Sequence, residues 1–178
     1  MPITTVRELF VHELPDAMSA EQQILKMLPE LQQEALNPEL KQAVNEHEQE
    51  TKQQVKNLQS VFKQLGEKPE ETTCFGIKGL IDEHQALHEE DPSPEMLEIA
   101  NVSGAEKTEH YEIVTYTGLV QMAKDLGEKE SAQLLQENLD QEKAMAKRVE
   151  ALSKALSKQA KATGRELAGA RSNGKAAR

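Results

Sequence analysis

The sequence predicts an all-α protein, a ferritin-like four-helix bundle with one long crossover that carries a short extra helix. Charged residues make up 29 % of the chain, aromatic residues only 3 %, and tryptophan is absent. Such a composition favours helices over sheets, which are enriched in β-branched and aromatic residues. Apolar residues also recur with the helical period in four long stretches. The connections within each pair of stretches are short and the one between the pairs is long, which is the ferritin-like connectivity.

The first helix is predicted over residues 5–35. It opens with Thr5-Val-Arg-Glu8, which has the spacing of a capping box. Pro15 and Pro29 lie inside the apolar pattern, and an interior proline removes a ladder hydrogen bond. We therefore expect a kink or a break near residue 14.

The second helix is predicted to begin after Asn37, with Pro38 at its first position, and to end at Gly66. The following segment, residues 66–93, is too long for a simple turn, and its apolar residues predict a short helix within it.

The third helix is predicted to open at Ser93-Pro94-Glu95 and to stop at Gly127, and the fourth follows directly. We expect residues 1–157 to form the bundle. Residues 158–178 lack a sustained apolar stripe, which predicts a basic, disordered tail.

Charge is distributed unevenly along the chain. The formal net charge is −10, yet residues 157–178 carry six basic residues against Glu166, a net of +5, which leaves −15 for residues 1–156. Because an acidic surface repels phosphate groups, we expect no nucleic-acid binding by the folded body. The tail could still contact anionic partners.

The chain has features of a cytoplasmic protein. Cys74 is the single cysteine, and the first residues do not follow the basic, apolar, small-residue order of a signal peptide. No stretch approaches the ~20 apolar residues needed to span a bilayer, so no membrane partner is expected.

Six polar residues fall at positions of the long helices where the apolar period calls for a hydrophobe. Burying unpaired carboxylates costs several kcal/mol each, so a cation is expected among them. Five carboxylates and one imidazole suit two Fe or Mn ions, since carboxylates can bridge two metals. The predicted ligands are Glu21, His47, Glu50, Glu109, Glu112 and Glu142, with any bridging role expected for Glu50 and Glu142.

Other residues give weaker signals. His84 and His88 have an i,i+4 spacing that can bind zinc, but without a third ligand in view an exposed polar face is the expected state. Tyr116, one turn after Glu112, is expected in the core with its hydroxyl bonded to a carboxylate. Cys74 has no basic neighbour in the sequence, so a structural thiol is expected.

Several of these motifs resemble the YciE/YciF family of bacterial ferritin-like stress proteins. The resemblance spans about residues 3–156 and rests on His47-Glu-Gln-Glu50, Glu109-His110-Tyr111-Glu112 and Gln-Glu142-Lys. It implies a ferritin-like bundle, homodimers and an association with osmotic or general stress. Unlike rubrerythrin-like bundles, the chain has no Glu-x-x-His motif at these positions. The second helix reads His-x-x-Glu, and the residue three positions after Glu142 is Met145 rather than a histidine.

Two hypotheses about function follow. In the first, a di-iron or di-manganese centre reacts with peroxide or dioxygen, as an oxidoreductase, or buffers metal under stress. No catalytic residue beyond the ligands is predicted. In the second, the protein is a metal-free structural or interaction protein whose polar core is a hydrogen-bond network with some protonated carboxyls.

Overall fold

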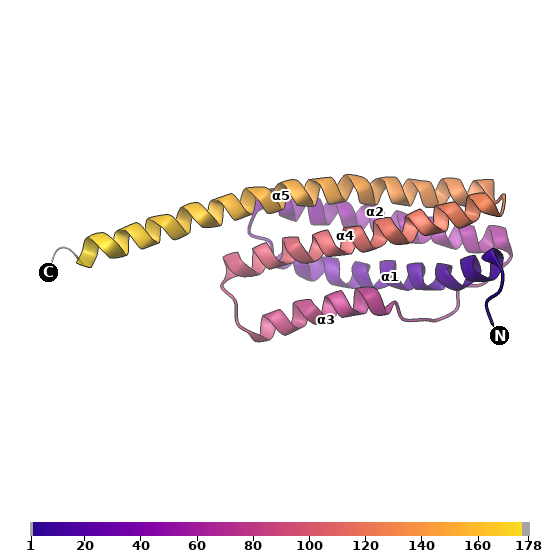
Figure 1. Ribbon diagram of the computed structural model, residues 1–178, viewed down its shortest axis with the longest axis horizontal. Helices are drawn as coiled ribbons and strands as arrows, with labels where there is room; N and C mark the ends of the chain where they lie inside the picture. The colour runs from indigo at the N-terminus through magenta and orange to yellow at the C-terminus, as the bar shows by residue number, and fades with distance from the viewer. Residues whose placement is uncertain (1, 176–178) are drawn as a thin grey trace.

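The computed structural model describes the backbone of residues 2–175 and the side chains of residues 2–161. Four long helices lie side by side and a fifth, shorter helix packs on the outside (Figure 1). Their bounds are α1 Val6–Glu34, α2 Pro38–Leu65, α3 Phe75–Glu89, α4 Pro94–Asp125 and α5 Lys129–Lys175. This is the predicted bundle, with α3 as the short helix in the crossover.

The helices are ordered α1, α2, α5, α4 around the bundle. Each contacts the next in that order, whereas the described parts of α1 and α5, and of α2 and α4, lie across the diagonal from each other. Helix α3 contacts only α1 and α4 within the same part of the chain. Side chains from all four long helices can therefore meet on the bundle axis, while α3 covers one side.

Local sequence signals set the helix ends. Thr5 and Glu8 form the complete capping box, and the Asn37 side chain accepts hydrogen bonds from the first backbone amides of α2. Gly66 ends α2 in the left-handed conformation, with φ of 70°, which a glycine adopts without the steric cost of a Cβ atom. Ser93 caps α4. These caps place the predicted boundaries within a few residues of the observed ones.

The predicted break near residue 14 is absent, because α1 continues through Pro15 and Pro29. A proline removes only one N–H donor from the ladder, and Pro15 is itself buried, as are Leu14 before it and Ala17 two residues after it. Packing on both sides keeps the helix continuous.

Helix α5 continues through residues 158–175, where the sequence predicted a disordered tail (Figure 1). Alanine, lysine and arginine make up half of these residues, and their helix propensities are high. Helix formation therefore does not require the apolar stripe on which the prediction relied. Residues 176–178 of the predicted tail lie outside the described residues.

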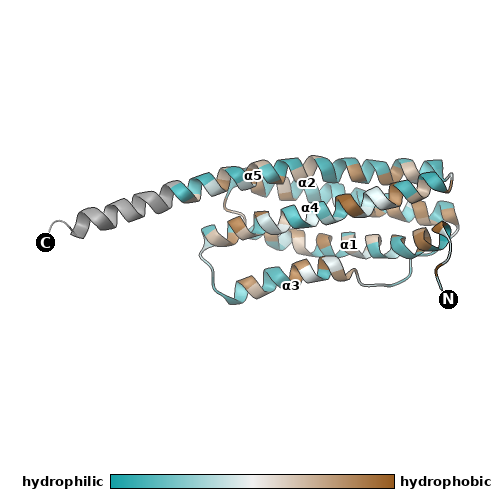
Figure 2. Cartoon of the chain, viewed as in Figure 1, coloured by the Kyte–Doolittle hydropathy of each residue, from teal (hydrophilic) through white to brown (hydrophobic). Residues whose placement is uncertain are grey.

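Apolar side chains form two clusters along the bundle axis, with a polar layer between them. Figure 2 shows hydrophobic positions recurring at intervals along the long helices between hydrophilic ones. One cluster contains Phe10, Leu58 and Leu119, and the other contains Leu40, Val102 and Leu152. Among the described residues, no helix is both long and apolar enough to cross a membrane.

Candidate metal centre

Four of the six predicted ligands converge in the polar layer. His47 on α2, Glu109 and Glu112 on α4, and Glu142 on α5 each offer one ligand atom, and these atoms all lie within 4.8 Å of one another. All four side chains are buried, and Glu142 is fully shielded from solvent. The helical stripe brings them together because Glu109 and Glu112 are one turn apart and face the axis from the same helix.

Glu21 completes the layer from α1. It is 1 % exposed, and its pKa is raised by burial and by the negative charge of nearby Glu142. Its Oε1 accepts a hydrogen bond from the Tyr116 hydroxyl, which confirms the expected pairing of that phenol with a carboxylate. All four long helices thus contribute to the layer.

Glu50 lies at the edge of the layer, where it is half-buried. Its negative charge raises the pKa of both Glu109 and Glu142, so it is near them but not within the tight group of ligand atoms. The buried stripe of α2 continues from His47 through Thr51 and Gln54, and Glu50 lies beside this stripe rather than on it.

The buried carboxyls lack enough hydrogen-bond donors. No protein group bonds to Glu21 Oε2, Glu109 Oε2, Glu142 Oε2 or either oxygen of Glu112, and His47 Nδ1 is also unpartnered. Buried polar atoms are normally satisfied, and leaving one unpaired costs about 1–3 kcal/mol. These atoms can be satisfied by a bound cation, so the residues fit a metal centre.

The pKa values of the carboxyls also show that the layer contains too many acidic groups for all of them to be ionised. Burial, followed by the negative charge of Glu142, raises the pKa of Glu21, Glu109 and Glu112 far above its usual range. Burial also raises the pKa of Glu142. Without a cation the layer therefore holds protons at neutral pH, and a cation must displace them to bind.

His47 is held in the form that binds metals. Its burial lowers the pKa to about 4, so the imidazole is neutral at pH 7. Its Nε2 lies 3.4 Å from Glu109 Oε1. A neutral imidazole is the ligating form of histidine, and this contact is therefore not an ion pair at that pH.

Amide side chains surround the carboxyls and extend the site. Gln54 Nε2 donates to Glu142 Oε1. Asn57 Nδ2 donates to Asn138 Oδ1 at 2.7 Å, and Asn138 Nδ2 donates to the Tyr116 hydroxyl at 3.0 Å. The ligand prediction omitted these amides, although Gln54 and Asn138 interrupt the apolar stripes as the carboxylates do.

A cavity of about 230 Å³ leads toward the carboxyls between α1, α3 and α4. Buried His47 and Glu109 line one part of it, and exposed Glu83 and Lys107, which form an ion pair between α3 and α4, line another. Most of the wall is apolar, including Ile24, Ile77 and Leu87. The cavity therefore connects the surface with the polar layer.

Comparisons with known proteins identify relatives across most of the chain. A family model described as a domain of unknown function, DUF892, matches residues 5–162. The protein YciF of Escherichia coli (strain K12) is 34 % identical over 145 residues, which cover 81 % of this chain and 87 % of YciF.

Solved structures share the fold. The crystal structure of the E. coli stress protein YciF matches with a TM-score of 0.83 and 32 % identity, covering 88 % of this chain and 99 % of that one. YcfI from Rhodopseudomonas palustris, whose description suggests a structural protein, matches with a TM-score of 0.80 and 38 % identity. That match covers 83 % of this chain and 94 % of YcfI.

Proposed function

Because this chain belongs to the DUF892 family and matches the stress protein YciF over most of its length, we propose that its bundle core binds two Fe or Mn ions. The family match confirms the resemblance found in the motifs, and the solved relatives confirm the helical bundle fold. The metal, its ligands and its reaction are our proposal.

The unpartnered oxygens of the polar layer carry this proposal. Five buried carboxyl oxygen atoms on four glutamates have no donor, and they come from α1, α4 and α5. A polar core that served only to hold the fold would be expected to satisfy its own acceptors. Metal ions would replace the missing donors and offset the mutual repulsion of the carboxylates.

The positions of the side chains suggest how the ions would be held. Glu109, Glu112, Glu142 and His47 would hold the ions, since their ligand atoms lie within 4.8 Å of one another. Glu21 on one side and Glu50 at the edge would complete the coordination. Glu112, whose two oxygens both lack a donor, would be a better candidate for bridging than half-buried Glu50.

The reaction would depend on access from the surface. Bound Fe or Mn would supply redox chemistry toward peroxide or dioxygen, both small enough for the 230 Å³ cavity. The apolar wall would limit water, and the Gln54 and Tyr116 hydrogen bonds would fix Glu142 and Glu21. Without turnover, the same site would serve as a metal buffer.

A metal-free structural protein is the second candidate. The closed part of the network, from Asn57 through Asn138 and Tyr116 to Glu21, favours it, since these groups are satisfied without a cation. Protonated carboxyls could fill the remaining layer. Thermal melts with Fe²⁺, Mn²⁺ or EDTA separate the two, because a ligand at 100 times its Kd adds about 2.7 kcal/mol of stability.

The direct test is metal analysis of protein purified without chelators. Glu109→Gln keeps the side-chain volume but removes the carboxyl group that can ionise and bind metal, so it should fold as well as the wild type. Exposed Glu137 on α5 provides the matched control, Glu137→Gln. We expect Fe or Mn in the wild type and in the control and a clear loss in Glu109→Gln. Equal metal content in all three proteins would overturn the proposed centre.

A further inference from the structure

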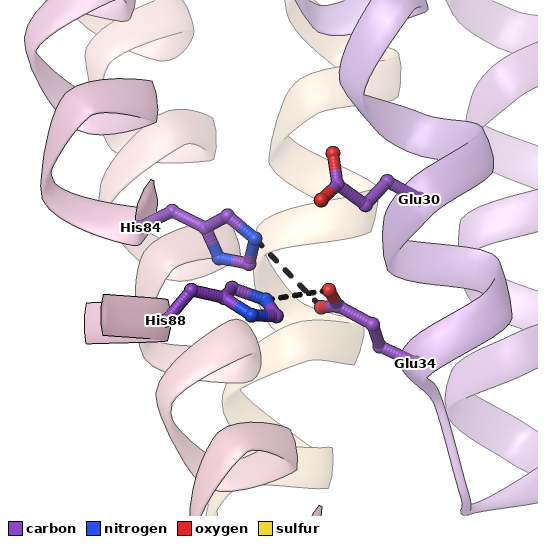
Figure 3. A group of neighbouring side chains, drawn as sticks. All are labelled: Glu30, Glu34, His84 and His88. Carbon is purple, nitrogen blue, oxygen red and sulfur yellow. Dashed lines mark hydrogen bonds and ion pairs between the residues drawn. The ribbon is translucent and has the colours of Figure 1, made fainter. Parts of the chain in front are cut away.

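A second group of metal-binding side chains lies outside the bundle axis, where α3 packs against the end of α1. His84 and His88 point from α3 toward Glu34, the last residue of α1, and Glu30 lies one turn earlier on α1 (Figure 3). One ligand atom from each of the four residues lies within 4.8 Å of the others. No third ligand for the two histidines could be predicted from spacing, because Glu34 is 50 residues from His84 in the chain.

The Glu34 carboxylate is the centre of this group. His88 Nε2 lies 2.6 Å from Glu34 Oε1, and Asn101 Nδ2 on α4 donates to Glu34 Oε2 at 2.6 Å. His84 Nε2 is 3.7 Å from Glu34 Oε2, too far for a hydrogen bond, and is buried without a partner. The buried Nε2 of His84 is therefore directed at the Glu34 carboxylate, whose two oxygens already have hydrogen bonds with His88 and Asn101.

Burial separates this group from an ordinary surface ion pair. The side chains of Glu34 and His84 are only 13 % and 11 % exposed, while His88 is 38 % exposed. Ion pairs on the surface are exposed to solvent and contribute little to stability, whereas this pair is largely shielded from solvent. One side thus stays open to solvent, as entry of an ion requires.

The donor set indicates the class of ion. Two imidazoles and one or two carboxylates form a common ligand set for Zn²⁺, with about 2.0–2.2 Å from metal to each ligand atom. The carbonyl end of a helix also favours a cation, and the last turn of α1 contains no basic residue. We propose that Glu34, His84 and His88, with Glu30 as an optional fourth ligand, form a zinc site that fastens α3 to α1.

Asn101 acts as the positioning residue of this site. Its hydrogen bond holds Glu34 Oε2, the oxygen nearer His84, and leaves Oε1 directed at His88. Outer groups of this kind orient metal ligands, and their loss weakens metal binding about 10- to 100-fold. His84 also lines the cavity that reaches His47. A zinc ion here would therefore fix one wall of the route to the polar layer.

Zinc titration of the full chain, stripped of metal beforehand, tests the proposal. The Glu109→Gln background weakens the central site, so that binding there does not obscure the second site. We expect that background to retain one tight zinc equivalent. The further double change His84→Gln and His88→Gln should remove it, and His12→Gln, an exposed histidine near the start of α1, should not. Zinc binding that is unchanged by the double substitution would overturn the site.

X-ray absorption at the zinc edge, on the same Glu109→Gln background loaded with one equivalent of zinc, provides a second test. We expect two imidazole ligands around one zinc ion. The polar layer contains a single histidine, His47, so a zinc bound there would show one imidazole at most. A spectrum with one imidazole or none would contradict the second site, and neither result would bear on Fe or Mn at the centre.

Discussion

Tyr116 on α4 donates a hydrogen bond to Glu21 on α1, and the same hydroxyl accepts a hydrogen bond from Asn138 on α5. The phenol therefore links three helices at the layer where the carboxyls meet. It also fixes one oxygen of Glu21 and leaves the other, Oε2, free to bind a cation.

The first prediction concerns this hydroxyl. Tyr116→Phe should weaken Fe²⁺ or Mn²⁺ binding about 10- to 100-fold, because a ligand loses the group that orients it. Metal titration followed by calorimetry measures the change. Tyr111→Phe is the control, since the Tyr111 hydroxyl contacts Cys74 Sγ rather than a predicted ligand. An equal effect of both substitutions would show that Tyr116 has no special role.

The second prediction concerns pH. In metal-free protein, burial raises the pKa of Glu109 to about 11, whereas an unfolded glutamate ionises near 4.5. The folded state therefore binds more protons than the unfolded state between these values, and stability must fall as pH rises. His47, with its pKa lowered to about 4, acts oppositely but only below its ordinary value of 6.5.

Thermal melts of metal-free protein should thus show a lower Tm at pH 8.5 than at pH 6.5. Glu109→Gln should flatten this dependence because it removes one of the groups responsible. Saturating Mn²⁺ should reverse it, since metal binding releases protons and strengthens as pH rises. A Tm that rises with pH in the metal-free wild type would contradict protonated carboxyls in the layer.

The third prediction concerns the packing of α3. A Cβ atom on Gly76 would collide with the ring and hydroxyl of Tyr111 on α4, whereas a Cβ atom on Gly79 would meet nothing within 4 Å. Gly76→Ala should therefore destabilise the protein by about 1–3 kcal/mol through overpacking. Gly79→Ala should stabilise it by about 0.5–1 kcal/mol through helix propensity. Urea unfolding of both variants measures the change in the free energy of unfolding. Equal changes in the two variants would contradict the close packing of Gly76 against Tyr111.

The fourth prediction concerns the cavity. Ala105 lines the cavity, so Ala105→Leu should narrow it. The larger side chain should lower the free energy of unfolding by about 1–3 kcal/mol. We expect peroxide consumption by the metal-loaded protein to slow while its metal content stays unchanged. Ala86→Leu, at an exposed position of α3, is the matched control. Equal rates of peroxide consumption in the two variants would show that peroxide does not reach the metal through this cavity.

The sequence predicted the bundle well because its caps and apolar stripes are local signals. Asn37 and Ser93 cap the first turns of α2 and α4, and Gly66 caps the last turn of α2. All three do so by contacts with their own neighbours in the chain. Glu21 and Glu142 could be placed inward because each interrupts a clear stripe, and both are buried.

Long-range contacts could not be predicted in this way. The group of Glu34, His84 and His88 depends on how the crossover lies across α1. Buried Glu98 was missed for the same reason: its Oε1 accepts hydrogen bonds from the amides of Leu36 and Asn37 in the α1–α2 turn. Such a role depends on residues about 60 positions away.

Glu50 shows a limit of reading faces from spacing. Its position three residues after His47 predicts a shared face, as for Glu109 and Glu112, which are both buried on α4. On α2, however, the buried stripe continues from His47 to Thr51 and Gln54, which leaves Glu50 at its edge. The structure thus separates two residues that the sequence pattern grouped together.

Anomalous diffraction from crystals grown with Fe²⁺ or Mn²⁺, and without chelator, would locate bound ions in the bundle core. We expect two anomalous peaks in the polar layer, in contact with His47, Glu109, Glu112 and Glu142. A map without peaks there, with the carboxyls bonded only to one another and to water, would contradict the proposed metal centre.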